Sequence, residues 1–191
     1  MYSLLSIGIM IFGVLIFLVI LCAIYVGITY NSLVKTRNIV LEAFSTMDVY
    51  LKKRWDLVPN LVEVVKGYAK HEKETFMQIT SLCTTSYDQL SAEKKINVNE
   101  QLTQGLSKIM AIAENYPELK ASQNFLDLSQ NLARVEEDIA NSRKYYNGAV
   151  RKMNTKVQMF PSNLVASMFG FKEYNMFEIE TEEKQNVKVE F

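Results

Sequence analysis

The feature that most constrains this chain is an uncharged apolar run near its N-terminus. From Leu4 to Ile28 the sequence holds 25 residues without a charged side chain, most of them isoleucine, leucine, valine or phenylalanine. As an α-helix this run would span about 37 Å at ~1.5 Å per residue, which exceeds the ~30 Å hydrocarbon core of a bilayer. Tyr2 and Tyr30 flank it, where interfacial aromatic residues are expected. Because a core helix of a soluble protein rarely lacks a polar face over such a length, the run predicts a transmembrane helix.

Two kinds of cleaved leader share some of these properties but lack others. A secretory signal peptide needs a basic start, a shorter apolar stretch and a cleavage site of small residues, whereas residues 1–34 contain no lysine or arginine. A lipoprotein signal needs a small residue before its cysteine, and Leu21 precedes Cys22. We therefore expect residues 1–30 to remain as an uncleaved anchor in a cell membrane.

Charges on the two sides of the run predict its orientation. No positive charge precedes it, while Lys35 and Arg37 follow it. The positive-inside rule then places the N-terminus outside and the following domain in the cytoplasm, in a single-pass topology.

The rest of the chain has the composition of one ordinary domain. Its size suits a single hydrophobic core, which we expect to span residues 31–172. The whole chain has 21 basic and 21 acidic side chains, and this balance argues against nucleic acid as a partner. Cys22 and Cys83 are the only cysteines. One lies in the apolar run and the other far along the domain, so no disulfide framework is expected.

Apolar residues beyond the anchor recur at helical spacing. Proline and glycine are scarce, which leaves little turn chemistry for a β fold. Three series step by three, four or seven residues and predict helix-on-helix packing. They are Leu33, Val40, Phe44, Met47, Leu51, Trp55, Val58, Val62, Val65, Ala69, Phe76, Ile79 and Cys83; Leu102, Leu106, Ile109 and Ala113; and Leu128, Leu132, Val135, Ile139, Tyr146, Val150, Met153 and Val157. We expect an all-α chain, in which the transmembrane helix is followed by an antiparallel bundle of three to four long helices.

Breaks between these series follow from local chemistry. The polar stretch 86–99 is expected to join two helices, with Asn97 and Glu100 forming a capping box for the second. Pro117 and Pro161 are expected to end helices, because proline lacks the backbone donor. Pro59 interrupts the first series without ending it, which predicts either a kink or a break.

The C-terminal part differs in character from the bundle. A cluster of apolar residues follows Pro161, and burying them is favourable enough that they should not all remain in water. They are Leu164, Val165, Met168, Phe169 and Phe171. Capping of the bundle, contact with a membrane surface and contact with another chain all remain open for this cluster. Residues 173–191 hold six acidic side chains and two lysines, and we expect them to form a flexible tail.

Several longer motifs resemble those of the LemA family. They are Asn31-x-Leu33-Val34, Asp48-Val49-x-Leu51-Lys52-Lys53-Arg54-x-Asp56-Leu57-Val58-Pro59-Asn60-Leu61-Val62, Val65-Lys66-Gly67-Tyr68-Ala69-x-His71-Glu72, Ala113-Glu114-x-Tyr116-Pro117-Glu118-Leu119-Lys120, Ala140-x-x-Arg143-x-Tyr145-Tyr146-Asn147, and Phe160-Pro161-Ser162-Asn163 with Phe169-Gly170-Phe171. The resemblance covers about residues 30–172. It implies a bacterial membrane protein with a short outer N-terminus and a helical bundle, and it implies no particular biochemical activity.

Residue patterns typical of catalytic or metal sites are missing from the sequence. His71 is the single histidine, and Thr75 stands where a zinc-protease motif needs a second one. The chain has no glycine-rich phosphate loop and no Gly-x-Ser-x-Gly elbow. We therefore expect no enzyme activity, no cofactor and no metal.

Candidate interaction residues are the apolar cluster above and the basic run Lys52-Lys53-Arg54. In a straight helix this run lies about 36 Å beyond Ile28, at ~1.5 Å per residue. A solvated face or a partner contact is therefore favoured over lipid headgroups. The sequence favours a membrane-anchored scaffold that associates with itself or with other membrane proteins. The alternative is an accessory modulator of a membrane protease or envelope-stress pathway, or an enzyme with an unrecognised site.

Overall fold

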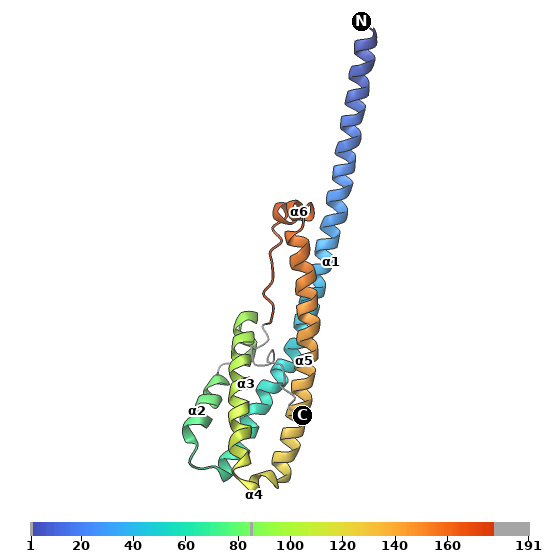
Figure 1. Cartoon of the computed structure of the whole chain (residues 1–191). Helices are drawn as coiled ribbons and strands as arrows, with labels where there is room; N and C mark the ends of the chain where they lie inside the picture. The colour runs from blue at the N-terminus through green and yellow to red at the C-terminus, as the bar shows by residue number, and fades with distance from the viewer. Residues whose placement is uncertain (1, 85, 178–191) are drawn as a thin grey trace, which may run out of the picture. The chain divides into compact units, whose positions relative to one another are not determined.

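In the computed structural model, residues 2–84 and 86–177 are described, with side chains from residue 8 onward, and every regular element among them is helical (Figure 1). The elements are α1 (Tyr2–Tyr68), α2 (Lys73–Leu82), the 3-10 turn η1 (Tyr87–Gln89), α3 (Ala92–Glu114), α4 (Pro117–Lys120), α5 (Gln123–Gln158) and α6 (Ser162–Met168). The predicted all-α fold, with a long apolar N-terminal helix and a helical bundle, is confirmed.

The long helix α1 carries the apolar run and continues into the bundle. Within the described residues it is the one helix long and apolar enough to cross a membrane. The helix passes through Pro59 and ends at Tyr68, so the proline does not break it. No stretch of non-helical chain separates the apolar run from Leu33, which is fully buried.

The chain forms two compact units, and α1 and α5 each contribute to both. The first unit comprises Met1–Glu42 and Asn147–Met176, and the second comprises Ala43–Tyr146 and Phe177–Phe191. The predicted boundaries at residues 30 and 172 remain predictions, and residues 178–191 of the expected tail lie outside the described part of the chain.

In the first unit, the end of α5 is fixed to α1 by polar contacts around a small apolar core. The ammonium group of Lys156 donates hydrogen bonds to the carbonyl oxygen of Ser32 (3.2 Å), to the Ser32 hydroxyl (2.5 Å) and to the Thr36 hydroxyl (2.8 Å). Asn154 pairs through its side-chain amide with the backbone N–H and C=O of Tyr174, both at 2.9 Å. Among the described side chains of this unit, the buried apolar residues are Leu33, Val40, Ala149, Val150, Met153, Val165 and Ala166.

The second unit is an up-down-up-down bundle of the second half of α1, α2, α3 and the first half of α5. Two contacts show that α5 runs antiparallel to α1: the rings of Phe44 and Tyr146 lie 5.9 Å apart, and Arg54 reaches Glu136. Helix α2 packs closely on α3 at Gly105. A Cβ added at this glycine would lie only 2.9 Å from Cγ1 of Ile79. The apolar series predicted from the sequence supply most of the core of this unit.

The start of α3 differs from the prediction. The helix begins at Ala92, and its N-cap is Ser91, whose hydroxyl accepts a 3.3 Å hydrogen bond from the backbone N–H of Lys94. Asn97 and Glu100 therefore lie inside the helix, and the predicted capping box is wrong. The physical reason is that Ser91 also offers a capping oxygen, and starting there brings Asn99 into the core, where it meets Arg54.

Candidate interaction surfaces

The basic run on α1 is divided by the helix into exposed and buried positions. Lys53 is exposed, and Lys52 is half-buried and pairs with Asp56 at 3.5 Å. Arg54, by contrast, is almost completely buried. The prediction that all three form one solvated or partner-binding face is therefore wrong for Arg54. Its position three residues after Leu51 and four before Val58 places it on the buried stripe, and this spacing is the sequence signal that was missed.

Arg54 lies at the centre of a polar network that joins three helices of the second unit. One guanidinium nitrogen donates to both carboxylate oxygens of Glu136 on α5, each at 2.9 Å, and to the hydroxyl of Thr103 on α3 at 3.1 Å. The other donates to the backbone carbonyl of Asn99 at 2.7 Å and to the side-chain oxygen of the same residue. These contacts assign Arg54 a structural role, because they cross-link α1, α3 and α5.

A second polar cluster forms around Tyr87, which the sequence placed in a linker. The Tyr87 hydroxyl donates a 2.6 Å hydrogen bond to the Asp48 carboxylate, and Lys95 bridges to the same carboxylate at 2.7 Å. The Tyr87 ring packs against Trp55, with centroids 5.4 Å apart. Burial, and next the bond to Asp48, raise the pKa of the Tyr87 phenol far above its ordinary value. No periodic signal marks a lone tyrosine in a polar stretch, so its burial was not predicted.

Cys83 is the one thiol of the bundle, and it lies half-buried just after α2. Burial, with a smaller effect of the Asp56 carboxylate, raises its pKa to about 11. A thiol with such a raised pKa is a poor nucleophile near neutral pH.

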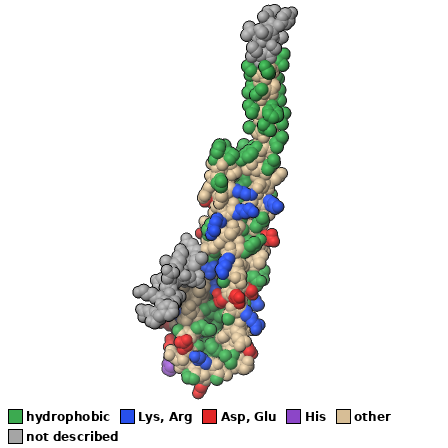
Figure 2. Space-filling model, turned by 45° about the vertical axis from the view of Figure 1, so that its right-hand side comes forward, with side chains coloured by type: hydrophobic (Ala, Val, Ile, Leu, Met, Phe, Trp, Pro, Cys, Tyr) green, Lys and Arg blue, Asp and Glu red, His purple; other side chains and the backbone are tan. Residues whose placement is uncertain are grey.

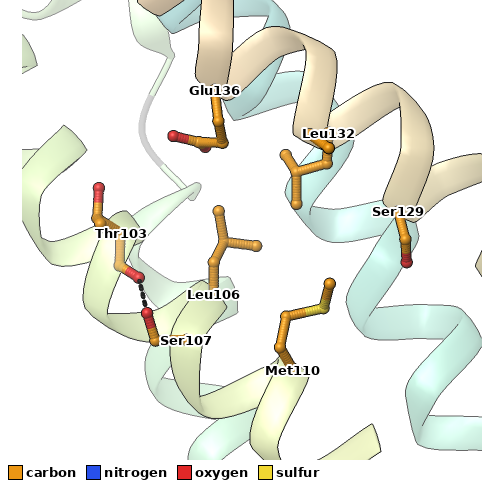
Figure 3. A pocket seen from close by; sticks show the side chains of 8 residues that line it. Thr103, Leu106, Ser107, Met110, Ser129, Leu132 and Glu136 are labelled. Atoms are coloured by element: carbon orange, nitrogen blue, oxygen red, sulfur yellow. Dashed lines mark hydrogen bonds between the residues drawn. The ribbon is translucent and has the colours of Figure 1, made fainter. Parts of the chain in front are cut away.

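An open groove with a volume of about 310 Å³ runs between α3 and α5 in the second unit (Figure 3). Its lining is mostly apolar, and Met110 is the most exposed of its large apolar side chains. Glu136 lies at one end, where Arg54 holds its carboxylate. The lining residues are Thr103, Leu106, Ser107, Met110, Ser129, Leu132, Ala133 and Glu136. A groove of this shape can accept apolar side chains of a partner.

A second hollow lies at the turn between α1 and α2, and the exposed His71 lines it with three lysines. These are Lys66, Lys70 and Lys73, of which Lys66 pairs with Glu63 at 2.7 Å. Over residues 2–84 and 86–177, no group of three or more histidine, cysteine, aspartate or glutamate side chains is placed to hold a metal ion.

The predicted apolar cluster lies in the first unit, on α6 and the residues that follow it. Val165 is buried and Phe171 half-buried, whereas Leu164, Met168 and Phe169 are exposed. The Phe169 and Phe171 rings contact Tyr30 of α1, with centroid distances of 4.7 and 5.9 Å. The guanidinium of Arg37 lies 5.7 Å from the centroid of the Phe171 ring. The structure therefore joins this cluster to α1 just beyond the apolar run.

Comparison with known proteins identifies the family to which this chain belongs. The LemA family model matches residues 43–191. Protein LemA of Metamycoplasma hominis is 26% identical over 171 residues, which cover 87% of this chain and 75% of that protein. Magnetosome proteins MamQ 1 and MamQ 2 of Paramagnetospirillum magneticum are each 22% identical over 175 residues. These residues cover 78% of this chain but only 64% of either MamQ protein. An N-terminal apolar helix and membership of this family both fit a membrane-associated protein. Since the family model spans most of its length, this chain belongs to the LemA family.

Proposed function

We propose that this protein is a membrane-anchored helical scaffold, which binds other membrane proteins or further copies of itself through the groove between α3 and α5. The observation that carries the proposal is the continuity of α1, whose apolar run and buried bundle residues belong to one helix. Anchoring by the apolar run would restrict the protein to one membrane and so raise its effective concentration toward partners in the same membrane. None of the relatives' names denotes a reaction.

The polar groups of the second unit support a scaffold more than a catalyst. Arg54 and Tyr87 are held by Glu136, Asn99 and Asp48 rather than directed into a cavity. The groove presents mainly apolar atoms, which suits side-chain packing at an interface.

Replacing Met110 with glutamate should weaken association while leaving the fold intact. Met110 lines the groove and is exposed, so the new carboxylate stays hydrated in the free protein and becomes desolvated only when a partner covers it. The measurement is quantitative co-purification of full-length protein from cross-linked membranes, together with the mass of the complexes. Met110→Glu should lose most of the co-purified partner or second copy.

Met77→Glu is the matched control, because Met77 is also an exposed methionine but lies on α2, outside this groove. It should keep the wild-type complexes. Equal complexes in wild type and Met110→Glu, or monomeric wild type without a partner, would contradict the proposal.

We also propose that the bundle faces the cytoplasm, as the positive charges after the apolar run indicate. A cysteine at the exposed Ser86, in a chain whose Cys22 and Cys83 are replaced by serine, should resist a membrane-impermeant thiol reagent in intact cells. It should react after lysis. Ready labelling in intact cells would show that the topology is the reverse of the one proposed.

A further inference from the structure

We propose that α6 and the turn before it lie in the headgroup region of the bilayer that α1 enters, so that the protein contacts the membrane at two places. The proposed occupant of this surface is a lipid interface with anionic headgroups. This inference rests on the anchoring by α1 proposed above. It assigns a role to the part of the apolar cluster that the protein itself does not bury.

The apolar cluster contacts α1 close to the end of the uncharged run. Phe169 and Phe171 pack on Tyr30, which is only two residues beyond Ile28, where the uncharged run ends. Lys156 contacts Ser32 and Thr36, so α5 ends close to the same level of α1 (Figure 1). Aromatic side chains at this level of a membrane-spanning helix are typical of the boundary between lipid and water.

Apolar side chains on and around α6 are exposed on one face. Leu164 and Met168 are four residues apart and share one face of α6, while Val165 and Ala166 on its other face are buried. Five large apolar side chains between the end of α5 and the C-cap of α6 remain exposed, and none of them belongs to the membrane-spanning run. Their exposed fractions are 58% for Met159, 77% for Phe160, 62% for Leu164, 65% for Met168 and 48% for Phe169. Such a short segment with one buried and one apolar exposed face suits insertion into an interface.

The first unit carries an excess of positive charge. The whole chain is neutral, but this unit holds six basic side chains and only two acidic ones, Glu42 and Glu173. Lys35 lies about 10 Å beyond Ile28 at ~1.5 Å per residue, which is close to the Debye length of ~8–10 Å. The basic residues are Lys35, Arg37, Arg151, Lys152, Lys156 and Lys172. They supply the positive charge that anionic lipid headgroups attract.

A second copy of the chain fits this surface less well than lipid does. Two such surfaces facing each other would bring the same basic residues together, and like charges oppose that contact. In Figure 2, green side chains gather where α1 leaves the rest of the first unit, and blue side chains lie next to them. This arrangement of an apolar patch bordered by basic groups matches the order of hydrocarbon and headgroups in a bilayer.

The test measures membrane depth with nitroxide labels on full-length protein that lacks Cys22 and Cys83. Single cysteines replace Leu164, Met168 or, as the matched control, the equally exposed Met77 of the second unit. The protein is reconstituted at low density in phosphatidylcholine vesicles that contain phosphatidylglycerol. The readout is the ratio of collision rates with oxygen, which concentrates in lipid, and with a water-soluble nickel chelate. The ratio should be several-fold higher at positions 164 and 168 than at position 77.

Three results would overturn the inference. They are a ratio at position 168 equal to that at position 77, shielding of the labels from both reagents, and dipolar broadening between labels that persists on dilution with lipid. The last two would assign the surface to the chain itself or to a second copy. A label at Leu15 tests the anchor separately. If that label contacts lipid while the label at position 168 contacts water, the anchoring by α1 stands and only the proposal for α6 fails. Vesicles of phosphatidylcholine alone should lower the ratio at 168, and an unchanged ratio would refute the headgroup contribution.

Discussion

Replacing Arg54 with alanine should lower the free energy of unfolding by about 2–4 kcal/mol, because it leaves buried polar groups without their partner. The backbone carbonyl and side-chain oxygen of Asn99 are the groups most affected, since Asn99 is 2% exposed. Glu136 is partly open to water, which keeps the expected loss below that for a fully buried ion pair. The measurement is chemical denaturation of the full-length protein in detergent, followed by circular dichroism.

Lys53→Ala is the control for that experiment, because Lys53 is the exposed neighbour in the same basic run. Its free energy of unfolding should stay within about 0.5 kcal/mol of wild type. Equal effects of the two substitutions would show that the network around Arg54 does not stabilise the bundle.

Replacing Ile139 with aspartate should destabilise the bundle by several kcal/mol, because it places a charge in the core. Ile139 is 2% exposed and lies on the α5 stripe between Val135 and Tyr146. An unpaired carboxylate there must either be desolvated or take up a proton, and both cost free energy. The expected readout is loss of cooperative unfolding or a sharply lowered denaturation midpoint.

Ala140→Asp adds the same charge one residue further along the helix, at an exposed position. It should leave the midpoint nearly unchanged. If the two aspartates had equal effects, the register assigned to the third apolar series would be wrong.

The helical fold was predictable because its signal is periodic and repeated. In the first series, which runs along α1 and α2, the structure buries the apolar positions at steps of three, four and seven, except that Phe44 and Cys83 are only partly buried. Each series has many members, so one misplaced residue does not change which face of the helix is predicted to be buried. Pro59 illustrates the limit, because the sequence left a kink and a break open, and only the structure shows that the helix continues through it.

The interaction surfaces were only partly predictable, because they depend on contacts between distant segments. Lys53 and Arg54 look alike in a charge profile, yet one is exposed and the other meets Asn99 and Glu136, which lie 45 and 82 residues away. The groove between α3 and α5 likewise depends on which faces of two helices meet. The apolar cluster could be recognised from its composition. Its position beside Tyr30 could be seen only in the folded structure.

Anchoring of the bundle in a membrane by the apolar run of α1 is tested most directly by alkaline carbonate extraction of cell membranes. Wild-type protein should stay in the membrane pellet with an intact mass that includes the apolar run. A variant with Val14→Arg and Leu18→Arg should appear in the supernatant with its helicity retained. Each arginine near the middle of the run opposes insertion by about 2.5–3.5 kcal/mol on insertion scales. Release of the wild-type protein by carbonate, or equal retention of the double-arginine variant, would contradict the account.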